Sequence, residues 1–228
     1  MGNFKTEENL REEIILIARK MNSCGINQGL SGNISIRLNN GILITPSSIS
    51  YDDMNISDIF YIDFTGNIIK NNKHSLKQKE GLSPSTEWRL HADILRNKTD
   101  ISAILHCHSI YATAISCHQK NIPSFHYMTA IAGGINIPCA EYATFGTEEL
   151  SKNCLRALKD RFACLLANHG QVSTGKTLGQ AFNLAKEVET LAQLYLEACK
   201  LGKPKNIRKK EMKKVLKKFN DMRYGIYE

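Results

Sequence analysis

Hydrophobic residues recur at every third or fourth position near the start of the chain. Residues 7–23 show this pattern, which is typical of a helix with one buried face, and the helix is expected to end before Gly25. Its apolar positions are Leu10, Ile14, Ile17, Ala18 and Met21. The chain therefore predicts an N-terminal amphipathic helix.

Short apolar stretches separated by turn residues follow this helix. The stretches 33–38 and 41–45 flank Asn39-Asn40-Gly41, and an Asn-Gly pair between two such stretches is a strong signal for a β-hairpin. The stretches 59–64 and 67–70 repeat the arrangement. Antiparallel strands are thus expected early in the fold.

The rest of the chain alternates between polar segments, further helices and apolar strands. In chain order we expect a loop over 71–85, a helix over 87–96 capped by Ser85 or Thr86, a buried strand over 102–109, a short helix over 109–117, a helix over 148–160 capped by Thr147, an apolar strand over 162–170 and a long helix over 177–200.

The mixture of strands and helices favours an α/β fold. The sequence contains no GxGxxG, so a dinucleotide site is not expected. No internal repeat or linker divides the 228 residues. We therefore predict a single domain over 1–228, in which 200–228 form a basic C-terminal helix and tail.

The composition is ordinary for a globular protein, with 42% hydrophobic and 23% charged residues. There is no run of about 18 apolar residues, so no transmembrane helix is expected, and the first residues lack the apolar segment of a secretory signal. Seven cysteines stand singly, without a CxxC pair, which fits reduced thiols better than a disulfide framework. These features predict a cytoplasmic protein without a membrane partner.

The net charge of +8 comes from residues 200–228. They hold eleven Lys and Arg against three Asp and Glu, so the rest of the chain carries no net charge. Such a segment can attract nucleic acid, but its apolar residues Met212, Val215, Leu216 and Phe219 recur at helical spacing. We favour a docked amphipathic helix with a solvated basic face and expect no nucleic-acid partner.

Three histidines stand out as candidate metal ligands. His106 and His108 occupy positions i and i+2 of the predicted strand 102–109, so both imidazoles project from one face, whereas Cys107 points to the other. His169 follows a second apolar stretch, and three imidazoles would leave a coordination position open, as in catalytic zinc sites. Histidines in strands are also common core residues, so the pattern alone leaves both interpretations open.

Three short segments rich in hydroxyl groups and small residues are candidates for anion binding. They are Leu30-Ser31-Gly32-Asn33, Thr45-Pro46-Ser47-Ser48 and Ser83-Pro84-Ser85-Thr86. Each lies at a strand edge or helix start, where backbone N–H groups can bind a phosphate, although each alone is commoner as a turn or cap. Glu87, in the first turn of the next predicted helix, is a candidate metal ligand or proton carrier beside a divalent cation.

Long stretches of the sequence resemble the class II aldolase/adducin family. The matching segments are GLSGNISIR (29–37), ITPSSI (44–49), PSTEWRLH (84–91), HCHS (106–109), PSFHYM (123–128), AGGINIPCAEYATFGTEEL (132–150), ANHG (167–170) and KEVETLAQLYL (186–196). Within the family, the stretches 123–150 and 186–196 are most similar to the L-fuculose-1-phosphate aldolases. The resemblance implies a central, largely antiparallel sheet flanked by helices, and a homotetramer with its sites between subunits.

The resemblance also implies a metal-dependent reaction. His106, His108 and His169 correspond to three zinc ligands, with Mn²⁺ or Co²⁺ as alternative ions, and Glu87 to a catalytic acid/base that can also bind the metal. The implied reaction is retro-aldol cleavage of a small sugar phosphate, a ketose 1-phosphate, to dihydroxyacetone phosphate and an aldehyde. L-Fuculose 1-phosphate, 5-deoxyribulose 1-phosphate and 5-methylthioribulose 1-phosphate are the candidate substrates.

Further positions acquire roles from the same resemblance. Asn33, Ser47 and Ser85-Thr86 correspond to residues that hold the substrate phosphate, and Gly32 would allow close approach. Tyr127 corresponds to a tyrosine that reaches across from a neighbouring subunit. Tyr224 corresponds to a tail tyrosine that helps to enclose the substrate, although its spacing from Phe219 is two residues longer than the family pattern.

Alternative functions remain open from the sequence. The first is another enzyme of the family, a 4-epimerase of the ribulose-5-phosphate type or a methylthioribulose-1-phosphate dehydratase. The resemblance implies that the epimerases of this family have Asp at the position of Glu87, so a Glu at this position favours an aldolase. The second is an adducin-like interaction protein without a working metal site, which the retention of all three histidines and Glu87 argues against.

Overall fold

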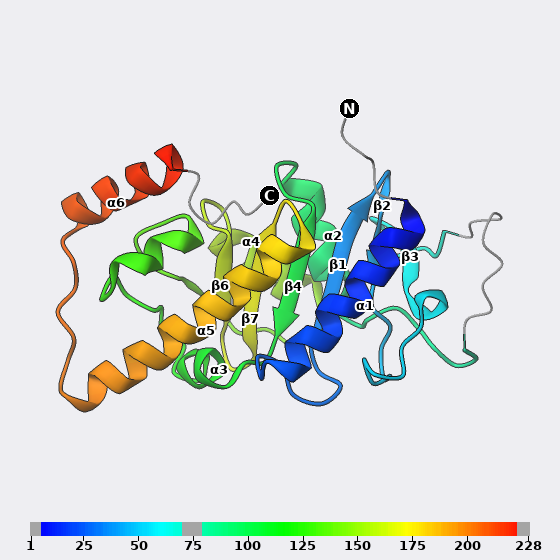
Figure 1. The fold of residues 1–228 in the computed structure, drawn as a ribbon, viewed down its shortest axis with the longest axis horizontal. Coiled ribbons are helices and arrows are strands. Elements are labelled where there is room, and N and C mark those ends of the chain that lie inside the picture. Colours follow the sequence, from blue (N-terminus) through cyan, green and yellow to red (C-terminus); the bar gives the residue numbers. More distant parts are fainter. Residues whose placement is uncertain (1–5, 70–78, 223–228) are drawn as a thin grey trace.

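The computed structural model describes residues 6–69 and 79–222 and contains one seven-stranded sheet (Figure 1). The strands are β1 (Asn33–Leu38), β2 (Gly41–Ile44), β3 (Phe60–Asp63), β4 (Ala103–Cys107), β5 (Cys139–Ala140), β6 (Ala163–Leu166) and β7 (Gly170–Gly175). Their order is β3-β2-β1-β4-β7-β6-β5, and every neighbouring pair is antiparallel except β5 and β6. The expected α/β fold with a largely antiparallel sheet is confirmed.

Helices cover both faces of this sheet. They are α1 (Glu7–Ser23), α2 (Trp88–Asn97), α3 (Ile110–Ser116), α4 (Glu148–Ala157), α5 (Leu178–Lys200) and α6 (Lys209–Asp221), with the 3-10 helices η1 (Ile56–Asp58) and η2 (Tyr127–Ala132). Helices α1 and α5 pack on one face, in front of the sheet in Figure 1, and α2 and α4 on the other. Alternate strand positions fill the two interfaces: Ile34 and Leu105 face α1 and α5, whereas Ile104 and Val172 face α2 and α4.

Side chains cap the helices where the sequence predicts it. The Oγ1 of Thr147 accepts a hydrogen bond from the N–H of Leu150 at 3.3 Å and so begins α4. Helix α2 differs, because its N-cap residue is Glu87 rather than Ser85 or Thr86, and the Glu87 side chain makes no capping hydrogen bond. The prediction was wrong because residues 86 and 87 form a turn and the helix begins only at Trp88, although Ser85 Oγ accepts a hydrogen bond from the N–H of Glu87 at 3.3 Å.

The predicted strand over 162–170 is in fact two strands and a turn. Strand β6 ends at Leu166, residues 167–169 form the turn, and β7 begins at Gly170. The sequence of β7, GQVSTG, contains one large apolar residue, so it lacks the signal of a buried strand although it lies between β4 and β6. The second predicted hairpin is reduced to an isolated bridge between Ile62 and Ile68 in the described residues, and most of the predicted loop over 71–85 lies outside them.

The C-terminal amphipathic helix docks as predicted. Met212 of α6 is fully buried, Val215, Leu216 and Phe219 are half-buried, and the helix packs against η2. The lysines of α6 face solvent. Within the two described ranges, no helix has both the length and the apolar character needed to cross a membrane.

Candidate functional site

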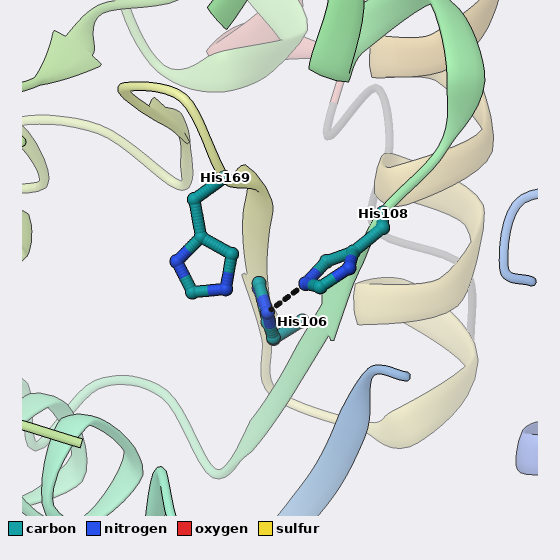
Figure 2. Close-up of side chains that lie close together, drawn as sticks. All are labelled: His106, His108 and His169. Atoms are coloured by element: carbon teal, nitrogen blue, oxygen red, sulfur yellow. Dashed lines mark hydrogen bonds between the residues drawn. The ribbon is translucent and has the colours of Figure 1, made fainter. Parts of the chain in front are cut away.

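The three histidines predicted as metal ligands converge on one point. His106 belongs to β4, His108 directly follows this strand, and His169 lies in the turn between β6 and β7, with the three rings facing one another (Figure 2). Their ring centroids are 4.7 to 4.9 Å apart. The Nε2 atoms of His106 and His108 are separated by 3.0 Å. The pairing of β4 with β7, which places Cys107 opposite Gln171, brings the distant third histidine to the first two.

The backbone of β7 fixes the orientation of His106. Its Nδ1–H donates to the carbonyl oxygen of Gln171 at 2.9 Å, so Nε2 faces the other imidazoles. Metal-binding histidines commonly donate their second ring N–H to such an acceptor, because this sets the tautomer and the ring angle. His106 is fully buried, and because Nδ1 is bonded to Gln171, Nε2 is the ring nitrogen that can bind a metal ion.

Glu87 places its carboxylate against the histidines. Its Oε2 lies 3.3 Å from His106 Nε2 and accepts a hydrogen bond from Asn33 Nδ2 at 2.9 Å. Its Oε1 lies 3.5 Å from His169 Nε2 and, although buried, has no hydrogen-bond partner. A buried carboxylate oxygen in this position is suited to binding a cation or exchanging a proton.

The charges of the site are coupled. Burial acts to raise the pKa of Glu87, but the charge and hydrogen bond of His106, with His169 and Asn33, hold it well below its usual range. Burial likewise acts to lower the pKa of His106, but Glu87 raises it above the usual value. Burial, reinforced by the charge of His106, lowers the pKa of His108 to about 4 and that of His169 to about 3. These two rings are therefore neutral at pH 7, which is the form that binds metal ions.

The residues present fit a divalent metal ion. His106, His108 and His169 each offer one ligand nitrogen, and these atoms lie within 4.8 Å of one another. Three imidazoles with a carboxylate at the remaining position resemble the ligand sets of catalytic zinc rather than the closed sets of structural zinc. The Oε1 atom of Glu87, which has no hydrogen-bond partner and lies 3.5 Å from His169 Nε2, can serve as a fourth ligand atom.

A cavity of about 440 Å³ opens beside these histidines. Most of the residues predicted to bind phosphate line it, namely Ser31, Gly32, Asn33, Ser47, Ser48, Ser85 and Thr86, together with Glu87, His108 and His169. No lysine or arginine of the described residues lines it, so an anion there would be bound by uncharged polar groups such as hydroxyls and amides. Thr45, which was also predicted to bind phosphate, does not line the cavity. Its buried Oγ1 accepts a hydrogen bond from the N–H of Ile34 at 3.2 Å.

Hydrogen bonds join two of the predicted anion-binding segments into one wall. The N–H of Ser85 donates to the carbonyl oxygen of Thr45 at 3.1 Å, and the N–H of Thr86 donates to Ser47 Oγ at 3.2 Å. Pro46 and Pro84 also form a bridge. Residues almost forty positions apart in the sequence thus lie side by side.

Two lining residues, Tyr142 and Phe145, carried no predicted role, and Leu30 was predicted only as part of the segment 30–33. Leu30, Tyr142 and Phe145 are 57%, 56% and 62% exposed, and we call these three side chains the apolar rim of the cavity. Tyr142 and Phe145 lie within the stretch 132–150 that resembles known proteins, but nothing in their spacing marks them as site residues.

Of the two tyrosines predicted to act in the site, only Tyr127 lies in the described residues, and it does not line the cavity of its own chain. Tyr127 lies in η2, is 48% exposed, and has its ring centroid 6.4 Å from that of Phe219. It is not among the residues that line the cavity. Tyr224 lies outside the described residues.

Comparison with known proteins assigns the chain to a family. The Class II Aldolase and Adducin N-terminal domain matches residues 12–196. The chain belongs to this family. Its resemblance to class II aldolases extends beyond the matched residues, since it is 42% identical over 218 residues to the L-fuculose phosphate aldolase of Escherichia coli strain K12, covering 95% of this chain and 96% of that protein.

Other relatives are named for a different sugar. The chain is 43% identical over 210 residues to the 5-methylthioribulose-1-phosphate/5-deoxyribulose-1-phosphate aldolase of Rhodospirillum rubrum, covering 92% of this chain and 90% of that protein. The class II aldolase fold is also seen in a solved L-fuculose 1-phosphate aldolase, with a TM-score of 0.87, 34% identity and coverage of 96% of this chain and all of that one. The relatives therefore support an aldolase, and their names differ in the sugar phosphate.

Proposed function

We propose that the protein is a metal-dependent aldolase that cleaves a ketose 1-phosphate to dihydroxyacetone phosphate and an aldehyde. The observation that carries this proposal is the convergence of three histidines and the unpartnered Oε1 of Glu87 at the edge of a cavity. The retro-aldol reaction needs a stabilised negative charge and a positioned proton donor, and this arrangement offers groups for both.

The phosphate of the substrate would be bound by uncharged donors. The segments 31–33, 47–48 and 85–86 contribute hydroxyls and an amide to the lining of the cavity. Residues 85–86 directly precede Glu87 and α2, where the helix dipole favours a phosphate. The sugar carbons would then extend towards the histidines.

His106, His108 and His169 would hold the metal ion, with zinc as the expected ion and Mn²⁺ or Co²⁺ as alternatives. When bound there, the ion supplies Lewis acidity to the ketose oxygens and stabilises the negative charge that bond cleavage produces. Gln171 holds His106 in the required tautomer through its carbonyl oxygen.

Glu87 would move the proton that completes the reaction. When the C3–C4 bond breaks, its electron pair stays with C3, and the C4 hydroxyl passes its proton to solvent as it becomes the aldehyde. Glu87, which has taken up a proton from solvent, then donates it to C3, which gives dihydroxyacetone phosphate. Tyr127 of a neighbouring subunit would assist at the C4 oxygen, and Tyr224 would help to enclose the substrate.

The assembly and the substrate follow from the same proposal. A homotetramer would place Tyr127 of one subunit at the cavity of the next, since Tyr127 does not line the cavity of its own chain. The apolar rim of Leu30, Tyr142 and Phe145 favours a ketose whose far end is a methyl or methylthio group.

The test is release of dihydroxyacetone phosphate, followed with a coupled reductase. L-Fuculose 1-phosphate, 5-deoxyribulose 1-phosphate and 5-methylthioribulose 1-phosphate are compared, each with and without a chelator. We expect release from at least one of them that the chelator abolishes and added zinc restores. Release that is insensitive to the chelator, or no release from any of the three, would refute the proposal, and free dihydroxyacetone phosphate also separates cleavage from epimerisation and dehydration.

A further inference from the structure

His91 is a fully buried histidine whose two ring nitrogens both contact strand β1. It lies in α2, four residues after Glu87. Its Nε2 is 2.5 Å from Asn33 Oδ1, and its Nδ1 is 2.7 Å from Ser35 Oγ. Asn33 and Ser35 are two positions apart on β1, so their side chains leave the same face of the sheet, towards α2.

The direction of each hydrogen bond follows from Glu87. An ionised carboxylate only accepts, so the bond between Asn33 and Glu87 is donated by Asn33 Nδ2 to Oε2 at 2.9 Å. Asn33 therefore turns its Oδ1 to His91, and His91 Nε2 carries the proton in that bond. In a neutral ring Nδ1 is then the acceptor, and Ser35 Oγ–H is the donor.

The burial of His91 agrees with a neutral ring. Burial, with the nearby charge of His106 as a second cause, lowers the pKa of His91 to about 3. The three bonds thus run in one direction, from the Ser35 hydroxyl through His91 and the Asn33 amide to the Glu87 carboxylate. All four side chains are buried.

We propose that His91 is a positioning residue for Glu87, which it holds in place through the amide of Asn33. An asparagine amide can adopt two orientations of similar shape, and the reversed one would turn Oδ1 towards the Glu87 carboxylate. The Nε2–H of His91 permits only the observed orientation. Oε2 is thereby fixed by Asn33, and Oε1, which has no hydrogen-bond partner, is the atom that exchanges a proton with the substrate carbon.

This inference rests on the proposed function for the role of Glu87. Oε1 removes a proton from the hydroxymethyl carbon of dihydroxyacetone phosphate in one direction and returns a proton to that carbon in the other. Exchange of this proton with deuterated water therefore measures the Glu87 step without the aldehyde half of the substrate. A base displaced from its working position loses rate, whereas the phosphate contacts proposed for Ser47, Ser85 and Thr86 do not involve His91.

The experiment compares His91→Leu with His91→Gln in the metal-loaded protein. Leucine removes the donor to Asn33, whereas the amide of glutamine retains one at a position close to Nε2. We expect His91→Leu to lower kcat and the exchange rate by about 100-fold, with metal content unchanged and KM within about threefold, and His91→Gln to recover to within about tenfold of the original chain. Equal losses in the two variants, or a kcat of His91→Leu within about twofold of the original, would overturn the inference.

A second pair of variants applies if His91→Leu does not fold. Ser35→Ala removes the donor to His91 Nδ1, and Ser151→Ala removes an equally buried hydroxyl, whose bond at 2.8 Å goes to Asp93 Oδ2 on the same helix as His91. We expect Ser35→Ala to lower the exchange rate by about tenfold and Ser151→Ala to leave it unchanged. Equal rates in these two variants would overturn the inference.

The tautomer of His91 can be measured without turnover. In protein labelled with ¹⁵N-histidine, long-range ¹H–¹⁵N correlation identifies which ring nitrogen carries the proton, and the His91→Gln spectrum assigns the resonances. We expect the Nε2–H form, and the Nδ1–H form would overturn the inference whatever the substrate. Failure of the original chain to cleave any ketose 1-phosphate would instead refute the proposed function, and the tautomer result would stand separately.

Discussion

Glu87 is buried, yet its surroundings favour the charged form. Burial of a carboxylate ordinarily raises its pKa, but the imidazole of His106 at 3.3 Å and the amide of Asn33 at 2.9 Å outweigh burial and hold the pKa of Glu87 well below its usual range. The two oxygens are unequal, because only Oε2 accepts a hydrogen bond. A proton on Glu87 is therefore unfavourable in the free site and is readily given to an acceptor.

Replacing Glu87 by glutamine tests this role. The variant keeps the size of the side chain and the three histidines, so we expect it to retain the metal while turnover falls by about 10²–10⁴-fold, the range for loss of a general acid/base. Metal content by elemental analysis and kcat are the measurements. Glu149→Gln, an exposed position in the first turn of α4, is the control and should leave both unchanged. Near-normal turnover in Glu87→Gln would remove Glu87 from the mechanism.

Buried histidines make the metal-free protein sensitive to mild acid. The pKa of His91 is lowered to about 3 and that of His108 to about 4, whereas a histidine in the unfolded chain titrates near 6.5. Below pH 6.5 the unfolded chain thus binds protons that the folded chain does not, and the free energy of unfolding falls as the pH falls. The depressed pKa of Glu87 adds to the free energy of unfolding above its unfolded value of about 4.5, and this contribution is lost only as the pH falls below that value. The raised pKa of His106 adds to the free energy of unfolding at low pH, and this contribution is lost as the pH rises above about 6.5.

We therefore expect stability to fall between pH 6.5 and pH 5 in the metal-free protein. His91→Gln should make this slope shallower by about 1.4 kcal/mol per pH unit, the contribution of one proton. Urea unfolding at several pH values gives the slope directly. The exposed His118 provides the matched control, His118→Gln, which should not change it. An unchanged slope in His91→Gln would contradict the burial of a neutral ring.

The segment before β1 forms part of the cavity wall through a glycine whose position leaves no room for a side chain. Gly32 has a φ of +82°, and a Cβ there would lie 2.5 Å from Asn27 Oδ1 and 2.9 Å from the carbonyl oxygen of His106. The hydroxyl of Tyr51 also donates to the Gly32 carbonyl oxygen at 2.8 Å. The turn is therefore packed directly against the strand that carries the histidines.

Gly32→Ala should disturb both stability and substrate binding. Gly29 belongs to the same segment and has a φ of +60°, but a Cβ there meets nothing within 4 Å. Both alanine variants incur the cost of a left-handed backbone, roughly 1–2 kcal/mol, and only Gly32→Ala adds the collision. We expect Gly32→Ala to be the less stable in urea and to show a raised KM, while Gly29→Ala keeps the KM of the original chain. Similar values for the two would mean that the close approach is not required.

Local patterns predicted the elements whose partners are close in the sequence. The helix over 7–23, the Asn-Gly hairpin and the Thr147 cap were all recognisable, because hydrophobic spacing and turn residues determine them locally. Strand β7 was missed since it is polar, and its burial depends on the neighbouring β4 and β6. The same distinction applies to the site: the spacing of His106 and His108 indicated a shared face, whereas the role of His91 depends on how α2 packs on β1.

At the scale of the whole molecule, the cavity and Tyr127 raise the question of which subunit completes a site. Glu87, His108 and His169 line the cavity, but Tyr127 does not, and it lies in η2 beside α6. If Tyr127 acts on the substrate, as we propose, it must come from a neighbouring copy of the chain. In an assembly with closed symmetry, every subunit would then contribute Glu87 to its own site and Tyr127 to the site of the next subunit.

Mixed assemblies of two inactive variants distinguish this arrangement from a site within one chain. Glu87→Gln lacks the acid/base but offers an intact tyrosine, and Tyr127→Ala lacks the tyrosine but has an intact cavity. Co-expressed in equal amounts and isolated through two different tags, they should regain somewhat more than a quarter of the original activity. Random assembly pairs an intact Glu87 with an intact neighbouring Tyr127 in one site of four, and the two tags remove the inactive assemblies of a single variant. If both groups came from the same chain, every site would retain one defect and no activity would return. A double variant carrying both changes, co-expressed with the original chain, calibrates subunit mixing, and full activity of Tyr127→Ala alone would show that this tyrosine is not needed.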